Sequence, residues 1–341
     1  MGSTYPYRTA VLCRSLPIRQ QLRRKGVQTY KIALFRKFIA KNFAYSFFFT
    51  IFATQIFLNI HFSGPLPQET IHSNCQINET MIRIKDLHLL RCKADLGGLK
   101  KGKLLINTIN AFSFVNARKD PAFAEALLKG DILLPDGAGI VRACKWLNIP
   151  HRPFERIAGA DLFIHEMGRV NAIGRENAEG MSDNGESTSR VKPVVMFMGS
   201  SEKVLALIKK KASEVYPYID IVTYSPPYKP EFSEEDNRDI INSINTTDPD
   251  LLWIGMTAPK QEKWTYQHWD ELNIHCHVGT IGAVFDFFAG TIRRAPVSWQ
   301  EKDMEWLFRL REEPRRMWRR YLIGNTRFLW HVFKEFRSSR K

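Results

Sequence analysis

Short apolar segments alternate with helix-like segments from about residue 100 onward. The apolar segments are Lys103–Asn107, Ile132–Pro135, Val194–Met198, Ile219–Thr223, Leu251–Gly255 and His275–Gly279. Between them, apolar residues recur with the helical period, as in Pro121–Leu128, Glu202–Val215 and Glu234–Ile244. Buried strands that alternate with helices are typical of parallel sheets. The pattern therefore predicts an α/β fold, in which a Rossmann-like parallel sheet carries helices on both faces.

Two other segments have a different composition. Residues 43–60 contain no charged residue and are rich in Phe and Ile, so they are long enough to span a thinned bilayer as a helix. The alternatives to a membrane-spanning helix are an interfacial or re-entrant anchor, or a coding start further along the chain, at Met81. The polar segment 168–192, rich in Gly, Ser and Asn, predicts a surface insertion.

The C-terminal part of the chain is both basic and amphipathic. Its apolar residues recur at helical spacing: Met317, Trp318, Tyr321, Leu322, Phe328, Leu329, Val332, Phe333 and Phe336. Arginines interleave with the first of these. We therefore expect three parts: a basic N-terminal extension (1–80), an α/β core (81–296) and a helical appendage (297–341) whose apolar face lies on a membrane surface.

The distribution of charge supports this division. The chain has a net charge of +15, but residues 1–42 carry ten Lys/Arg with no acid, and residues 293–341 carry a net +8. The segment between them is slightly acidic, at −3. Basic ends around a neutral body favour contact with an anionic membrane. No RRM, KH or zinc-finger pattern is present, so nucleic acid is not an expected partner.

Polar residues follow the ends of the predicted strands, where ligands bind in parallel α/β sheets. Thr108 and Asn110 offer hydroxyl and amide groups after the first strand. Asp136 follows the second, and its carboxylate suits either a general base or the cap of the next helix. Arg156 is placed either to face a diphosphate or to pair with Asp161.

The remaining strand ends offer weaker signals. Gly199 and Ser200 form a short turn suited to phosphate or ribose. The strand that ends at Gly255 leads to Gln261 on the first turn of a helix. Asp286, in an apolar segment, is either a structural acid or a ligand to a sugar or base.

Two tempting motifs are rejected. Gly137-x-Gly139 lacks the third residue of the dinucleotide fingerprint, because Arg142 stands there. Asp248 and Asp250 resemble a metal-binding D-x-D motif but precede their strand, which predicts a turn at the wrong edge of the sheet. The five cysteines and nine histidines are dispersed, so no metal or other cofactor is expected.

Five blocks, in this order, resemble the WecG/TagA/CpsF family of bacterial glycosyltransferases (glycosyltransferase family 26). They are NTIN at 107–110, LLPDGAGIV at 133–141, RIAGADLF at 156–163, PKQEKW at 259–264 and GAVFDFFAGTIRRAP at 282–296, continued by MEWLFRLREEPRRMWRRYL at 304–322. The resemblance covers about residues 100–330. It departs from the family at Phe112 and Phe114, where related members often carry His and Tyr, and this difference bears on acceptor choice.

The resemblance implies inverting transfer of a sugar, of the N-acetylmannosamine or glucose type, from a UDP-sugar to a polyprenyl-diphosphate-linked saccharide. This would serve cell-envelope or exopolysaccharide biosynthesis at the cytoplasmic face of the bacterial inner membrane. Asp136 would be the base, and three side chains would bind sugar hydroxyls: Thr108, Asn110 and Gln261. Gly199, Ser200, Gly255 and Asp286 would form the uridine and ribose side.

Without a metal, arginines must supply positive charge to the departing diphosphate, and some of those in the appendage would bind the acceptor's diphosphate or anionic lipid instead. These arginines are Arg156, Arg293, Arg294, Arg315, Arg316, Arg319 and Arg320. A non-catalytic, membrane-associated protein that binds a nucleotide or lipid is the alternative function. The sequence leaves a homo-oligomer open.

Overall fold

The computed structural model describes residues 82–180, 192–301 and 303–339. The whole N-terminal extension (1–80), including the predicted hydrophobic segment 43–60, lies outside these residues. No helix in the described part of the chain is long and apolar enough to cross a membrane.

The described residues contain a sheet of six strands in the order β2-β1-β6-β5-β3-β4, and every neighbouring pair is parallel. The strands are β1 (Leu104–Ile109), β2 (Ile132–Pro135), β3 (Val194–Gly199), β4 (Asp220–Tyr224), β5 (Leu251–Gly255) and β6 (His277–Thr280). Each overlaps a predicted strand within two residues. The predicted parallel α/β fold is therefore confirmed.

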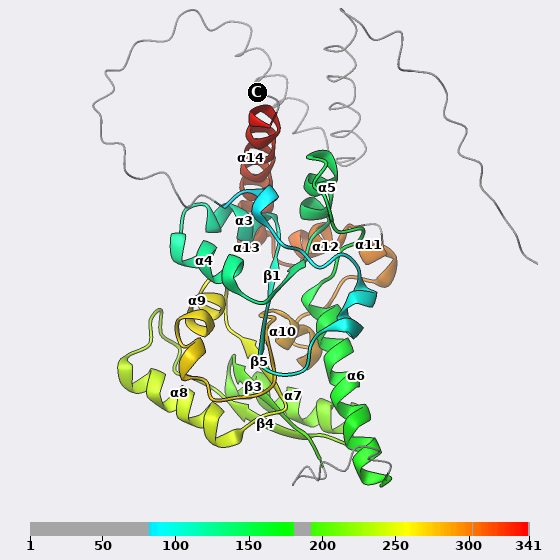
Figure 1. Cartoon of the computed structure of the whole chain (residues 1–341), viewed down its shortest axis with the longest axis vertical. Helices are drawn as coiled ribbons and strands as arrows, with labels where there is room; N and C mark the ends of the chain where they lie inside the picture. The colour runs from blue at the N-terminus through cyan, green and yellow to red at the C-terminus, as the bar shows by residue number, and fades with distance from the viewer. Residues whose placement is uncertain (1–81, 181–191, 302, 340–341) are drawn as a thin grey trace, which may run out of the picture. The chain divides into compact units, whose positions relative to one another are not determined.

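Helices cover both faces of this sheet (Figure 1). One face packs against α6 (Gly159–Ala178), α7 (Glu202–Val215) and α10 (Val284–Ala289), and the other against α8 (Glu234–Thr247) and α9 (Lys260–Gln267). Side chains alternate between the two faces along a strand. In β3, Phe197 belongs to the first apolar cluster, whereas Met196 and Met198 belong to the second.

A third apolar cluster lies beside β1 and β2. It is formed by α3 (Ala111–Ala117), α4 (Pro121–Lys129), α5 (Ala138–Trp146) and the C-terminal helix α14 (Gly324–Ser338). Between α10 and α14 lie α11 (Val297–Glu301), α12 (Glu305–Glu312), α13 (Pro314–Trp318) and a π-helical turn, Arg319–Ile323. The short 3-10 turns are Ile84–Asp86, Lys93–Gly98 and Trp269–Glu271.

The apolar side of the appendage faces the core, which corrects the sequence-based expectation that it lies on a membrane. Phe328 and Val332 are 3% and 1% exposed. The Phe328 ring meets Phe114 of α3 edge-on at 5.6 Å, and Trp146 of α5 stacks on Phe336 at 4.3 Å. Burial of aromatic rings in this way is a strong source of packing energy. The apolar stripe therefore fixes α14 to the core.

The predicted insertion at 168–192 is also partly wrong. Residues 168–178 continue α6, and Val170 and Gly174 are buried along it. A side chain at Gly174 would meet the carbonyl oxygen of Tyr218, whose N–H donates to Asn171 Oδ1 at 3.1 Å. Small and polar residues in this stretch serve close packing against the loop before β4. Residues 181–191 lie outside the described residues.

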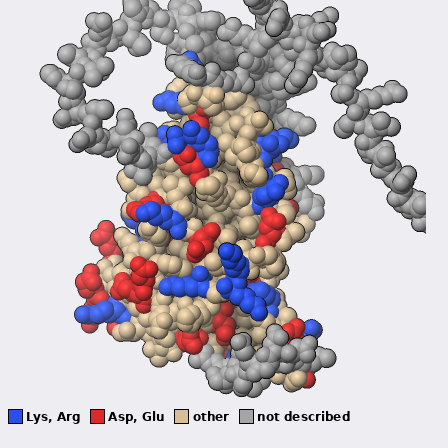
Figure 2. Space-filling model, viewed as in Figure 1, with Lys and Arg blue, Asp and Glu red and all other residues tan. Residues whose placement is uncertain are grey.

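Acidic side chains gather over α8, which carries Glu234, Glu235 and Asp236 in its first turn (Figure 2). Acids at a helix N-terminus are stabilised by the helix dipole. This cluster belongs to the slightly acidic body of the chain, away from the basic appendage.

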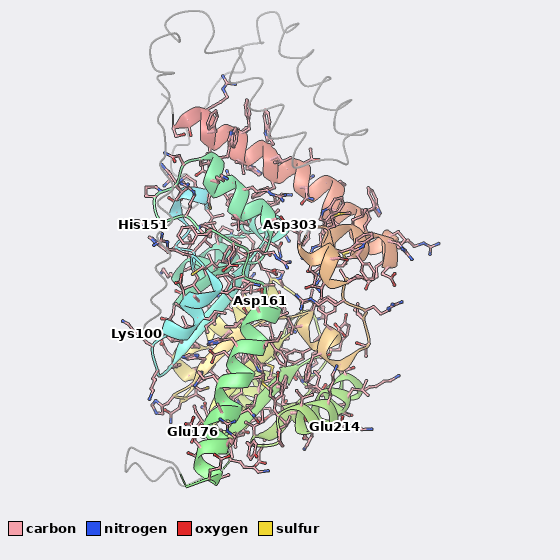
Figure 3. The ribbon with its side chains drawn as sticks, turned by 90° about the vertical axis from the view of Figure 1, so that its right-hand side faces the viewer. Lys100, His151, Asp161, Glu176, Glu214 and Asp303 are labelled. Atoms are coloured by element: carbon pink, nitrogen blue, oxygen red, sulfur yellow. The ribbon has the colours of Figure 1, made fainter. Side chains whose placement is uncertain are left out.

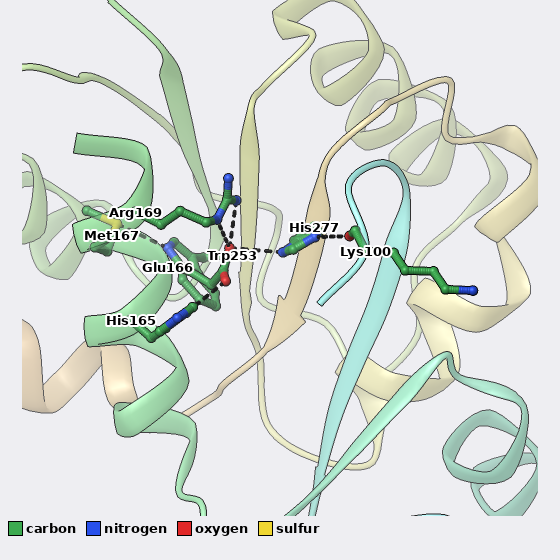
Figure 4. A network of polar contacts seen from close by, with 7 residues as sticks. All are labelled: Lys100, His165, Glu166, Met167, Arg169, Trp253 and His277. Atoms are coloured by element: carbon green, nitrogen blue, oxygen red, sulfur yellow. Dashed lines mark hydrogen bonds and ion pairs between the residues drawn. The ribbon is translucent and has the colours of Figure 1, made fainter. Parts of the chain in front are cut away.

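A buried polar network joins α6 to the start of β6 (Figure 4). The carboxylate of Glu166 accepts hydrogen bonds from Arg169 at 2.7 Å and lies 2.9 Å from His277 Nδ1 and 3.1 Å from His165 Nδ1. The other ring nitrogen of His277 lies 2.8 Å from the carbonyl oxygen of Lys100. Burial would raise the pKa of Glu166, but the hydrogen bonds from His277 and Arg169 outweigh it and lower the pKa to about 2.

We expect Glu166→Gln to lower the free energy of unfolding by roughly 3 kcal/mol at neutral pH, because Arg169 and His277 lose the buried carboxylate that they contact. The depressed pKa stabilises the fold above the ordinary Glu value of 4.5, and this contribution is lost as the pH falls toward 2. Urea unfolding at stepped pH should therefore show the two proteins converging in acid. A constant difference across that range would contradict the assignment.

Candidate active site

Asp136, Thr108 and Asn110 meet at the carboxyl edge of the sheet, because β1 and β2 are neighbours. Thr108 is in register with Leu134, and the next residue, Ile109, is in register with Pro135. Asp136 directly follows Pro135. Asn110 caps α3: its Oδ1 accepts from the N–H groups of Phe112 and Ser113. The capping leaves the Asn110 amide NH₂ as the group it can offer a ligand.

Gly137 allows the chain after β2 to lie close to Asn110. Its φ of +157° lies outside the ordinary range of side-chain-bearing residues, and a Cβ there would sit 3.3 Å from Asn110 Cβ. Gly137 occupies the N-cap position of α5, and that cap uses no side-chain hydrogen bond. The alternative role of Asp136 as a helix cap is therefore not supported, and its carboxylate remains available for chemistry.

The pKa of Asp136 is raised. Burial is the main cause, and the nearby carboxylate of Glu305 adds to it, while Arg156, Arg309 and Arg320 oppose both. A carboxylate with a raised pKa binds a proton more strongly, which suits a general base.

Arg156 contacts the appendage rather than Asp161. Its Nη1 donates to Glu305 Oε2 at 3.1 Å, and Arg309 donates to Glu305 Oε1 at 3.1 Å. Asp161 lies instead at the start of α6 (Figure 3), where it accepts a hydrogen bond from the N–H of Ala158. It also forms an ion pair with Lys93. The sequence-based pairing of Arg156 with Asp161 is thus wrong as a direct contact.

Glu305 is the centre of a cluster of arginines. The pKa of its carboxyl is lowered: burial works against this, but Arg309, Arg156 and Arg294 outweigh burial. Sequence reasoning missed Glu305 and Arg309. Their i, i+4 spacing in the 304–322 block was the available signal, but spacing alone does not show that Arg156 lies opposite them.

The appendage contributes a further cation. The Arg320 guanidinium lies 5.0 Å from the centre of the Phe112 ring and is one of the charges acting on Asp136. Phe112, one of the two positions singled out in the sequence analysis, thus lies against a cation of the site. Phe114, the other position, is fully buried in the core instead.

The structure brings together Arg156, Arg294 and Arg320 from the predicted set of arginines. It places Arg293, Arg315 and Arg319 on the exposed surface, where Arg319 lies over the Trp318 ring. The side chain of Arg316 lies outside the described residues. The predicted arginines therefore have different surroundings, and their binding of a diphosphate or lipid stays a prediction.

Gln261 follows β5 and is buried, 3% exposed, on the first turn of α9. Its Nε2 donates to Glu262 Oε1 at 2.9 Å, while its Oε1 has no hydrogen-bond partner among the described residues. Burial raises the pKa of Glu262 to about 7, partly offset by the hydrogen bond from Gln261.

The glycines of the predicted uridine side have packing roles. A Cβ at Gly199 would lie 2.6 Å from the carbonyl oxygen of Gly255, and one at Gly255 would lie 2.4 Å from the Phe285 ring. Ser200 accepts a hydrogen bond from Ser225 at its carbonyl, and Asp286 accepts one from Thr291. These contacts explain the residues structurally, and ligand binding by them stays a prediction.

The Asp248–Asp250 segment is a turn, as predicted. Asp248 ends α8 in a left-handed conformation, and Asp250 accepts from Val194 N at 2.7 Å, at the amino ends of β3 and β5. Within residues 82–180, 192–301 and 303–339, no group of three His, Cys, Asp or Glu side chains is placed to hold a metal.

Comparison with known proteins identifies a family and relatives of this chain. The sequence model of the glycosyl transferase WecG/TagA/CpsF family matches residues 82–341. An N-acetylglucosaminyldiphosphoundecaprenol N-acetyl-beta-D-mannosaminyltransferase of Bacillus spizizenii is 27% identical over 241 residues, covering 71% of this chain and 82% of that protein. The protein of the same name in Bacillus subtilis is 27% identical over 273 residues, covering 80% of this chain and 93% of that protein.

We expect Glu262→Gln to be more stable than the parent above pH 7, by roughly 3 kcal/mol, because Gln cannot ionise in the buried site. In the parent, the raised pKa means that stability is complete below the ordinary value of 4.5 and is lost as pH rises through about 7. Thermal unfolding measured from acid to alkaline pH tests this. Parallel curves for parent and variant would show that Glu262 does not titrate in this way.

Proposed function

The chain belongs to the WecG/TagA/CpsF family of glycosyl transferases, and from that premise we propose that it transfers a sugar, with inversion, from a UDP-sugar to a polyprenyl-diphosphate-linked saccharide. The non-catalytic alternative is set aside because the family is one of transferases. The observation that carries the proposal is a partly buried carboxylate, Asp136, beside converging arginines at the carboxyl edge of the sheet.

The named relatives suggest which substrates to test. Both are N-acetylmannosaminyltransferases whose names specify an N-acetylglucosaminyl-diphosphoundecaprenol acceptor. We take the same acceptor type and UDP-N-acetylmannosamine as the first pair for this chain. A glucose-type donor and a role in cell-envelope or exopolysaccharide biosynthesis belong to the same proposal.

The reaction is a single displacement. Asp136 removes the proton from the acceptor hydroxyl while that oxygen attacks the anomeric carbon, and the bond from this carbon to UDP breaks with both electrons on the departing phosphate oxygen. Attack opposite the leaving group inverts the anomeric centre. In the same proposal, Thr108, Asn110 and Gln261, at the carboxyl edge of the sheet, hold sugar groups.

The arginine cluster supplies the charge that the leaving group needs. Arg156, Arg294, Arg309 and Arg320 act on Glu305 or Asp136, so four cations oppose two carboxylates. The excess of about two positive charges suits a diphosphate, and preorganised cations stabilise charge that develops in the transition state. We therefore propose that transfer is metal-independent. Activity lost to EDTA and restored by Mg²⁺ or Mn²⁺ would contradict this.

The outward side of the appendage is suited to a membrane surface. Ile323 and Trp330 are 39% and 43% exposed, and Arg327, Lys334 and Arg337 are exposed at spacings that place them on the same side of the helix. Aromatic and basic residues together favour the interface of an anionic bilayer. We propose that this side, rather than the buried stripe, contacts the cytoplasmic face of the bacterial inner membrane.

Asp136→Asn is expected to reduce transfer by ~10²–10⁴-fold, because the amide cannot accept the acceptor's proton. Binding of UDP should change little, since UDP does not contact the base in this mechanism. Radiolabelled sugar transfer and calorimetric titration with UDP measure the two quantities. Near-parental turnover by this variant would remove Asp136 from the mechanism.

Arg320→Ala and Arg315→Ala form a matched pair that separates catalysis from membrane contact. With a short-chain, water-soluble acceptor, Arg320→Ala should lower turnover about 10–100-fold, because a cation that acts on the leaving group is lost. Arg315→Ala should keep this turnover but bind anionic vesicles several-fold more weakly, as expected for one surface cation. Equal turnover for both variants would place the catalytic cations elsewhere.

A further inference from the structure

Gln261 and Glu262 form a buried polar pair that the mechanism above uses only in part. The two side chains are 3% and 2% exposed. They share one hydrogen bond, from Gln261 Nε2 to Glu262 Oε1 at 2.9 Å. Gln261 Oε1 and Glu262 Oε2 are both buried without a hydrogen-bond partner among the described residues. Buried polar atoms are nearly always paired in folded proteins, so these two oxygens require an explanation.

The amide oxygen lies beside the turn that follows β6. A Cβ at Gly282 would sit 3.4 Å from Gln261 Oε1 and 3.3 Å from the carbonyl oxygen of Met256. Because Gly282 has no side chain, no side chain from this residue lies against the oxygen. The strand β6 pairs with β1, whose end carries Thr108 and Asn110. The unpaired oxygen is therefore at the same edge of the sheet as the proposed sugar-binding groups.

The hydrogen bond to Glu262 determines what the amide can offer. A Gln side chain has two N–H donors and one acceptor oxygen. Glu262 engages the nitrogen, which leaves Oε1 turned the other way. A ligand that satisfies Oε1 must bring a donor, which in a sugar is a hydroxyl or the N–H of an acetamido group.

We propose that Glu262 is a positioning residue that acts through Gln261, holding its amide so that Oε1 accepts a hydrogen bond from a sugar hydroxyl or acetamido N–H. This inference rests on the proposed sugar transfer. It adds Glu262 to the site as a residue that does not itself touch the substrate.

The chemistry of Glu262 fits this role. Because burial raises its pKa to about 7, the side chain stays largely protonated below neutral pH, where an ordinary Glu is ionised. A neutral carboxyl keeps a carbonyl oxygen to accept from Gln261, with its proton on the other oxygen. Glutamine has the same shape and also offers a carbonyl oxygen, whereas leucine and methionine fill similar volume without an acceptor.

The kinetic test compares the parent with Glu262→Gln, Glu262→Leu, Gln261→Ala and the double variant that combines Gln261→Ala with Glu262→Leu. The substrates are UDP-N-acetylmannosamine and a short-chain N-acetylglucosaminyl-diphospholipid. Glu262→Leu should lower kcat/KM about 10-fold, and Glu262→Gln should restore it to within about threefold of the parent. In the Gln261→Ala background, Glu262→Leu should cost no more than about threefold. Thr265→Val is the control, because the Thr265 hydroxyl donates to the Gln261 backbone carbonyl rather than to its side-chain amide, and this variant should retain parental kinetics.

Independent losses that multiply in the double variant would overturn the proposal, since Glu262 would then act without Gln261. So would parental activity in Glu262→Leu when Gln261→Ala is impaired. Glu262→Met replaces Glu262→Leu if the latter does not fold, as judged by its thermal transition.

A second measurement does not depend on the substrate. In protein labelled with ¹⁵N-glutamine, the side-chain amide signal of Gln261 is assigned by its loss in Gln261→Ala. This signal should shift in Glu262→Leu and stay nearly unchanged in Thr265→Val. An unmoved signal in Glu262→Leu would overturn the positioning role. A shifted signal in a protein with no transfer activity would instead reject the proposed function.

Discussion

The carboxylate of Glu305 joins the appendage to the α/β core at the place where the site is built. It accepts one hydrogen bond from Arg156, which follows the second strand, and one from Arg309, one helical turn further along α12. Without this carboxylate, the guanidinium groups of Arg156, Arg294 and Arg309 would be partly buried near one another without a counter-charge. Their mutual repulsion would oppose the packing of the appendage against the core. Arg142 and Asp303 form a second ion pair between the same two parts, at 2.6 Å. The cation cluster thus depends on a carboxylate that neutralises part of it.

The packing of the appendage determines the rest of its surface. Because Phe328 and Val332 are buried against α3, residues on the opposite side of the same helix must point outward. Trp330 is one of these residues, and Lys334 lies over its ring. Amphipathicity therefore has two consequences here: one side of the helix stabilises the fold, and the other presents aromatic and basic groups to the surroundings.

The sequence predicted the features that local periodicity and strand ends encode. The parallel sheet, the turn at Asp248 and the grouping of Asp136 with Thr108 and Asn110 follow from strand order and alternation alone. It could not predict which side of α14 is buried, because an amphipathic helix shows the same pattern against a protein core or a lipid surface. Residues 168–178 were misjudged because small and polar residues in a helix resemble a loop. Glu305 was missed because its partner Arg156 is 149 residues away.

Three buried or partly buried acids show why the position of cations, rather than their number, determines proton affinity. Glu166 accepts direct hydrogen bonds from the His277 ring and the Arg169 guanidinium, and its pKa falls to about 2. Glu262 accepts a side-chain hydrogen bond from the neutral Gln261 amide, and its pKa rises to about 7 because burial outweighs this bond. Asp136 has three arginines nearby, yet its pKa is raised, because they act on it through charge alone while burial and Glu305 act the other way. The arginines nearby therefore leave Asp136 its affinity for a proton, which is what the proposed role of this carboxylate as a base beside a cation cluster requires.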